Sequence, residues 1–321
     1  MHEQFKLELL ALVEYLLDPN KRLFVGYLAG AILFAFLIYL KHGKLQTNDR
    51  GFFLYLFNPR IWFHISAILD YQLFIINRIL RSLLWAPIVM SMVPIAIGLS
   101  SALEWALGNI QPITEQRWIV VFVFTLLLFL FDDFTRFLLH FIMHKSPFLW
   151  QFHKVHHSAK VLTPLTVYRS HPIENFLYAT RMAIAQGTAV GFGYILLGPT
   201  LSMYDILVVN VFIFAFYIMG SNLRHSHIKW RRAKNIEKWL ISPLQHQIHH
   251  SRQRQFFDCN FGTALAVWDR LFQTLVLSGN TERIVFGLSD KEASHRSLLD
   301  AYLRPFKSCL QMLFKKNSSK N

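Results

Sequence analysis

Long apolar segments without a single charge dominate this 321-residue sequence. A helix needs about 20 apolar residues to cross roughly 30 Å of hydrocarbon. Four segments of this kind contain no Asp, Glu, Lys or Arg: Leu23–Leu40, Ser82–Leu103, Met182–Tyr204 and Ile206–Leu223. Trp118–Phe131 is also uncharged, and its helical pattern continues through two aspartates toward His144. We therefore expect an all-α integral membrane protein with about five transmembrane helices, the last two forming a hairpin.

The basic residues lie between these apolar segments. Lys and Arg number 33 against 19 Asp and Glu, and the net charge of +14 alone would suggest a nucleic-acid partner. Residues 41–81 and 221–254 carry most of the cations of the loops. Because cytoplasmic loops are enriched in Lys and Arg, we expect these segments and the C-terminus in the cytoplasm and no nucleic-acid partner. The sequence favours a multi-pass protein, and we expect a bacterial inner membrane.

This topology divides the chain into three regions. Residues 1–117 form an N-terminal membrane region with two spans, and residues 52–77 read as interfacial helices because Arg60 and Asp70 interrupt an aromatic segment. Residues 118–276 hold a helical, cytoplasmic cap with the histidine clusters. Residues 277–321 are expected to form a cytoplasmic tail.

Eleven of the 15 histidines fall between residues 140 and 250, a window with only three carboxylates. Residues at i, i+3 and i+4 share one face of a helix, so each histidine cluster is expected to aim its imidazoles at one point. Imidazole binds iron, zinc, copper and nickel. The clusters are His140 and His144, then His153, His156 and His157, and finally His246, His249 and His250.

Eight such ligands are too many for one ion, because zinc usually takes four and octahedral iron six. The sequence therefore predicts two metal ions. The shortage of acids argues against a carboxylate-bridged site, which needs several inward-pointing Glu. A dinuclear centre held by histidine alone remains.

The motifs around these histidines resemble the fatty acid hydroxylase / sterol desaturase superfamily, whose members are membrane-bound di-iron enzymes. Asp133 stands seven residues before His140, as in the family's first histidine motif. The family's later motifs resemble residues 148–158, 169–174 and 245–251. Asn260-Phe261-Gly262 and 268–272 resemble its closing stretch. Two positions depart from the family: Phe141 replaces an Arg, and Gln273 replaces a Gly. The resemblance covers about residues 118–276 and identifies this region as a catalytic domain.

The resemblance also implies a ligand set. His225, in the motif Arg224-His225-Ser226-His227, becomes the ninth ligand, and His171 and His227 are further candidates. Asp133 would accept a hydrogen bond from a ligand histidine, or else cap the polar end of a span. Glu174 would orient His171, or else serve as a carboxylate at a helix start.

The activity implied is O2-dependent oxidation of a lipid by two iron ions, which zinc may replace on isolation. Hydroxylation, desaturation and ether cleavage of a fatty acyl, sterol-like or alkylglycerol lipid all fit. Electrons would come from a separate cytochrome b5-, ferredoxin- or flavoprotein-type donor, because the sequence has no nucleotide fingerprint and no haem or iron–sulfur pattern.

Two other classes stay open on the sequence. A His-rich metal transporter would place its ligands near the bilayer midplane on broken helices, whereas these clusters lie beside cytoplasmic cations. In a non-catalytic protein, metal would only staple the cytoplasmic segments together.

Overall fold

The computed structural model describes residues 15–43, 51–81, 91–108, 110–198, 211–279, 281, 283–289, 295 and 297–318. Within these ranges the chain is all-helical, and two isolated bridges are its only extended pairings: Leu240 with Leu265, and Ser251 with Phe286. The all-α expectation is therefore confirmed for the described residues.

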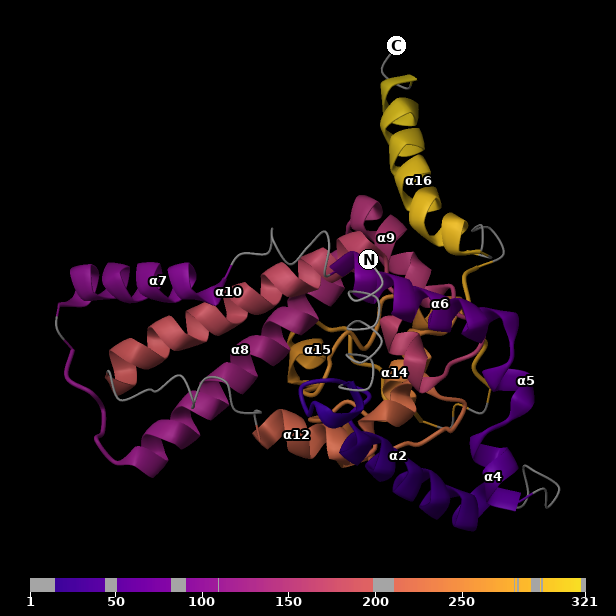
Figure 1. Cartoon of the computed structure of the whole chain (residues 1–321), viewed down its shortest axis with the longest axis horizontal. Helices are drawn as coiled ribbons and strands as arrows, with labels where there is room; N and C mark the ends of the chain where they lie inside the picture. Colours follow the sequence, from indigo (N-terminus) through magenta and orange to yellow (C-terminus); the bar gives the residue numbers. More distant parts are fainter. Residues whose placement is uncertain are drawn as a thin grey trace, which may run out of the picture.

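Three long helices extend side by side away from the rest of the molecule (Figure 1). They are α7 (Met92–Leu107), α8 (Arg117–Lys145) and α10 (Pro172–Leu197). Apolar side chains of α8, including Phe124 and Leu128, pack on Ala189 and Leu197 of α10. On its other side α10 meets α7 through Gly187, where an added Cβ would lie 2.7 Å from the Cβ of Ile95. Only glycine permits this approach.

The opposite end of α8 enters a compact group of short helices. An aromatic core joins Tyr27 of α2 (Val25–Ile38) and Phe129 of α8 to Phe216 of α12 (Val211–Ile218). The elements that follow α8 in this group are α9 (Pro147–His157), η3 (Pro164–Tyr168), η4 (Ser221–His225), α13 (Lys234–Glu237), α14 (Pro243–His249), η5 (Arg254–Phe256) and α15 (Val267–Leu271). Both α9 and α14 begin with proline after a capping serine, Ser146 and Ser242, which accept the amide hydrogen bonds of their first turns.

Helix α16 (Leu298–Ser318) lies in the segment that we expected to be a tail, and it projects from the molecule (Figure 1). The segment expected to be interfacial forms α4 (Gly51–Leu56), α5 (Pro59–Trp62) and α6 (Ile65–Leu80). η1 (Tyr39–Gly43) prolongs α2.

Among the described residues, one helix is long and apolar enough to cross a membrane on its own, namely α8. The segments Gly51–Trp62 and Ile65–Leu80, which are bent by 82° where they meet, pass the same test when they are taken together as one span. The apolar helices α2 and α7 are shorter. Parts of three expected spans lie outside the described residues: 82–90 of the second, 199–204 of the fourth and 206–210 of the fifth. The count of five spans stays a prediction.

Candidate metal centre

Nine histidines from four elements meet in two adjoining groups. The five-histidine group contains His140, His144, His153, His157 and His249. The four-histidine group contains His156, His225, His246 and His250. Within each group the ligand atoms lie within 4.8 Å of one another. These are the nine residues that the sequence predicts as ligands.

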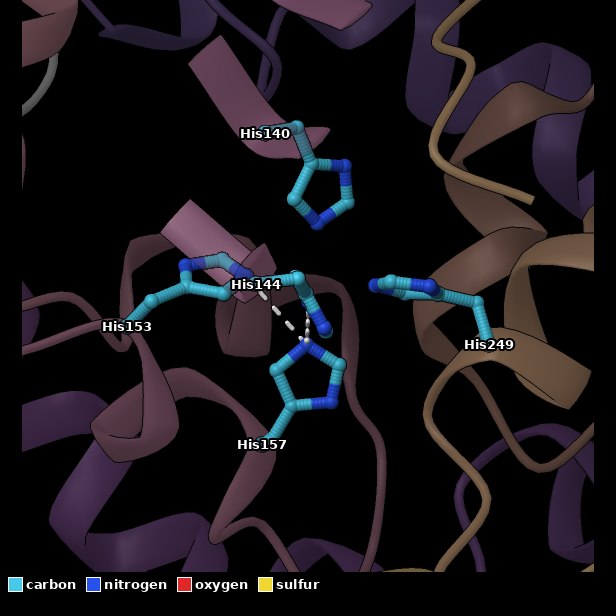
Figure 2. A group of neighbouring side chains, drawn as sticks. All are labelled: His140, His144, His153, His157 and His249. Atoms are coloured by element: carbon cyan, nitrogen blue, oxygen red, sulfur yellow. Dashed lines mark hydrogen bonds between the residues drawn. The ribbon is translucent and has the colours of Figure 1, made fainter. Parts of the chain in front are cut away.

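The two H-x2-H-H clusters each contribute to both groups. In α9, His153 and His157 stand one turn apart and face the five-histidine group, whereas His156 faces the other. In α14 the pattern is reversed, because His246 and His250 face the four-histidine group and His249 faces the five. The expectation that each cluster aims at one point therefore holds for His140 and His144 but is wrong for these two clusters. Figure 2 shows the five-histidine group, with rings that converge from separate segments.

The Nε2 atoms point inward and lie unusually close together. In the five-histidine group His157 Nε2 lies 3.2 Å from both His144 Nε2 and His153 Nε2 (Figure 2). In the four-histidine group His225 Nε2 lies 3.0 Å from His246 Nε2 and 3.2 Å from His250 Nε2. The Nε2 atoms of His140 and His249 are buried without a hydrogen-bond partner.

The Nδ1 atoms are held from outside the centre. His140 Nδ1 donates to Phe261 O at 2.9 Å, and His249 Nδ1 donates to Cys259 O at 2.6 Å. His156 Nδ1 donates to Arg169 O at 3.2 Å. A carbonyl oxygen can only accept, so these imidazoles carry their proton on Nδ1 and a lone pair on Nε2. Partners of this kind fix the orientation and tautomer of metal-binding histidines.

Burial keeps these imidazoles neutral at physiological pH. It lowers the pKa of His156 to about 3 and holds the pKa values of His246 and His250 well below the ordinary value. Neutral imidazole is the form that binds metal. Lone pairs that converge without a shared proton repel one another unless a cation lies between them. The nine Nε2 atoms therefore fit two transition-metal ions, and nitrogen donors suit iron, zinc, copper or nickel.

The two further candidates, His171 and His227, lie outside both groups. His171 caps α10, because its Nδ1 accepts from Ile173 N at 3.0 Å while its Nε2 donates to Tyr302 O at the same distance. His227 Nε2 donates to Tyr55 O at 2.6 Å. Both residues therefore make contacts that stabilise the fold, and neither lies among the candidate ligands of the two groups.

The two carboxylates singled out from the sequence support the centre in different ways. Glu174 Oε1 accepts from His153 Nδ1 at 3.0 Å, so it orients His153 and not His171 as expected. Among the described residues Asp133 accepts from the amides of Ala264 and Leu265 and from the Trp268 indole, and not from an imidazole. It thus fixes the segment that follows Phe261.

The closing segment is held in place by the carboxylate of Asp269. Asp269 accepts from the amides of Phe261 and Gly262 at 2.8 and 2.7 Å. Asn260 and Gln273 have left-handed φ values of 55° and 59°. Glycine adopts this region without strain, which accounts for the family's Gly at the position of Gln273. Asp258 Oδ1 lies 3.4 Å from His144 Nδ1.

Cavities adjoin the centre. The first, of about 330 Å³, is lined by His140 and His153 of one group and by His156, His225 and His246 of the other. The second, of about 300 Å³, is lined by His144, His157 and His249. Both groups are therefore reached from the first cavity, and the five-histidine group is reached from both.

Replacing Glu174 by alanine is expected to weaken metal binding about 10- to 100-fold, because His153 loses the carboxylate that orients it. Glu174→Gln keeps an acceptor and should recover part of this loss. Titration of the metal-free protein with a divalent ion measures both variants. Equal affinity of wild type and Glu174→Ala would show that the contact is unimportant for metal binding.

Comparison with known proteins gives matches in the same region. The family model for fatty acid hydroxylases matches residues 125–274. Alkylglycerol monooxygenase of Xenopus tropicalis is 25% identical over 166 residues, which cover 51% of this chain and 32% of that protein. The Delta(7)-sterol 5(6)-desaturase of Gibberella zeae is 25% identical over 151 residues, 47% of this chain and 41% of that protein. Ornithine lipid hydroxylase of Rhizobium tropici is 25% identical over 174 residues, 54% of this chain and 47% of that protein.

These matches span about a third to a half of the length of the relatives. No solved structure matches the chain.

Proposed function

We propose, on the match of residues 125–274 to the fatty acid hydroxylase family model, that this chain is a membrane-bound oxidoreductase that uses O2 to hydroxylate or desaturate a C–H bond of a lipid. The observation that carries the proposal is the convergence of nine histidine Nε2 atoms in two adjoining groups beside a cavity. A metal centre that served only to hold segments of the chain together would not need to face a cavity.

Two iron ions are the metals that we propose, one in each group. When bound, they would supply the activation of O2 and the oxidation of the lipid carbon. The protein's own residues position them. Glu174 and the carbonyls of Phe261 and Cys259 hold the imidazoles in the Nδ1–H tautomer, and Asp269 and Asp133 hold the segment that carries those carbonyls.

The protein also determines where the substrate lies. The first cavity brings a ligand against imidazoles of both groups, and the buried setting limits the access of bulk water to the reacting carbon. We place the long apolar helix α8 across a membrane, with its His140 and His144 turn emerging at the cytoplasmic surface. Electrons come from a separate donor protein in this proposal.

Untargeted lipid mass spectrometry tests the function. Cells that express the wild-type protein should contain a lipid that is absent with His250→Ala, which removes an imidazole of the four-histidine group. A product heavier by one oxygen identifies a hydroxylase or monooxygenase, and a product lighter by two hydrogens identifies a desaturase. Purified, iron-loaded protein that consumes no O2 with any lipid extract and a working reductant would refute the proposal. Metal uptake into sealed vesicles would instead support a transporter.

A further inference from the structure

Six arginines line the first cavity alongside the histidines. They are Arg22, Arg78, Arg81, Arg136, Arg181 and Arg224, and the lining contains one carboxylate, Glu174. Hydrocarbon needs no guanidinium groups for its binding, so this lining indicates that the ligand carries negative charge.

Four of these arginines have a single carboxylate partner between them among the described residues. Arg136 Nε and Arg181 Nη2 share a single partner, Asp132, at 2.8 and 2.9 Å. Arg224 donates to two neutral carbonyls, Ser221 O and Thr263 O. The guanidinium of Arg22 lies over the Tyr217 ring, 3.7 Å from its centroid.

Neither Arg22 nor Arg224 pairs with a carboxylate among the residues that the structure describes. Arg224 is buried, with 5% of its surface exposed. A guanidinium withdrawn from water without a counter-charge is unfavourable for folding. Its planar fork of donors matches a carboxylate or a phosphate, which it binds with two parallel hydrogen bonds. An anionic ligand would supply the missing counter-charge.

The arginines adjoin the metal centre in the sequence as well as in the cavity. Arg224 directly precedes His225, and Arg136 lies one helical turn before His140 on α8. An anion bound by these arginines therefore sits close to the imidazoles of both groups.

We propose that the first cavity binds the anionic headgroup of a lipid, a phosphate or a carboxylate, with Arg22 and Arg224 as its recognition residues. This inference rests on the proposed function and names its substrate class. Because the arginines and the histidines share one cavity of about 330 Å³, the carbon that is oxidised lies near the headgroup and not near the end of the chain.

Lipid binding to the purified protein, kept in bilayer discs of phosphatidylcholine, tests this class directly. The anionic probes are lysophosphatidic acid and the free fatty acid of the same chain, and the neutral probe is the corresponding monoacylglycerol. Inorganic phosphate alone shows whether a free anion suffices. Dissociation constants are compared for wild type, Arg22→Gln, Arg22→Lys and Arg60→Gln, the last of which removes an exposed arginine of α5.

We expect at least one anionic lipid to bind wild type at least about tenfold more tightly than monoacylglycerol does. Arg22→Gln should weaken this binding about 10- to 100-fold, Arg22→Lys less, and Arg60→Gln should leave it unchanged. An unchanged metal content of Arg22→Gln shows that the variant is folded.

Equal affinity for the anionic and neutral lipids, or no effect of Arg22→Gln, overturns the inference. Inorganic phosphate that binds as tightly as the lipid also overturns it, because the ligand is then a free anion. If the Arg22→Gln protein does not fold, the relative affinities of the wild-type protein for the anionic and neutral lipids decide the question. Selective binding without an oxidised product refutes the proposed function alone, whereas an oxidised product without selectivity for the headgroup refutes only this substrate class.

Discussion

With His249 replaced by alanine, the protein is expected to lose about one of the two proposed metal ions and to form no detectable oxidised lipid. His249 belongs to the five-histidine group, and its buried Nε2 has no hydrogen-bond partner. Its Nδ1 donates to Cys259 O at 2.6 Å, so Nε2 carries a lone pair that can bind a metal. Loss of a partner that merely orients a ligand already costs 10- to 100-fold in metal affinity or activity. Loss of the ligand itself should cost more.

His171→Ala is the matched control, because His171 is a buried histidine of the same domain that lies outside both groups. It removes the cap of α10 and should cost about 1 kcal/mol of stability without changing the metal content. Metal analysis of the purified proteins and product analysis by mass spectrometry separate the two variants. Retention of both ions by His249→Ala, or loss of an ion from His171→Ala, would contradict the assignment of the ligands.

Removal of the Asp70 carboxylate should destabilise the fold by about 3–5 kcal/mol. Asp70 of α6 is fully buried, and its Oδ1 accepts from Arg169 Nη1 at 2.7 Å. Arg169 is 1% exposed and also donates to Val155 O and Ser158 Oγ beside α9. Asp70→Ala would leave this guanidinium buried without a counter-charge. Chemical denaturation in detergent measures the loss.

The double variant Asp70→Leu/Arg169→Met tests the cause, since replacement of a whole buried ion pair by apolar residues is often neutral. It should recover most of the stability that Asp70→Ala loses. A cost below about 1 kcal/mol for Asp70→Ala would mean that the pair contributes no more than an exposed ion pair does. The metal content should fall with the stability, because Arg169 O accepts from His156 Nδ1.

The sequence predicted which histidines meet, but not how they are shared. Spacing alone places His153, His156 and His157 on one side of a helix. It does not reveal that the residues one turn apart face one group while the middle residue faces the other. That division depends on the position of α14 and η4 relative to α9, which is a property of tertiary packing.

Residues distant along the chain were the hardest to predict. Glu174 lies in the first turn of α10, which was one of its two expected roles, but its side chain meets His153 and not the nearby His171. Of the two roles left open for Asp133, the contact with an imidazole is not formed among the described residues, and the carboxylate instead holds the segment at Ala264. The arginines of the cavity come from α6 and its C-cap, α8, α10, η4 and the segment before α2, so no local pattern joins them.

The reciprocal sharing of histidines between α9 and α14 has a consequence for cooperativity. An ion in either group would fix the positions of both helices, because each helix contributes histidines to both groups. The ordering that the first ion imposes would then already be complete when the second ion arrives, which favours positive cooperativity between the two ions. In the wild-type protein, singly loaded chains would be a minor species, and only a variant that disables one group, such as His249→Ala, would accumulate them.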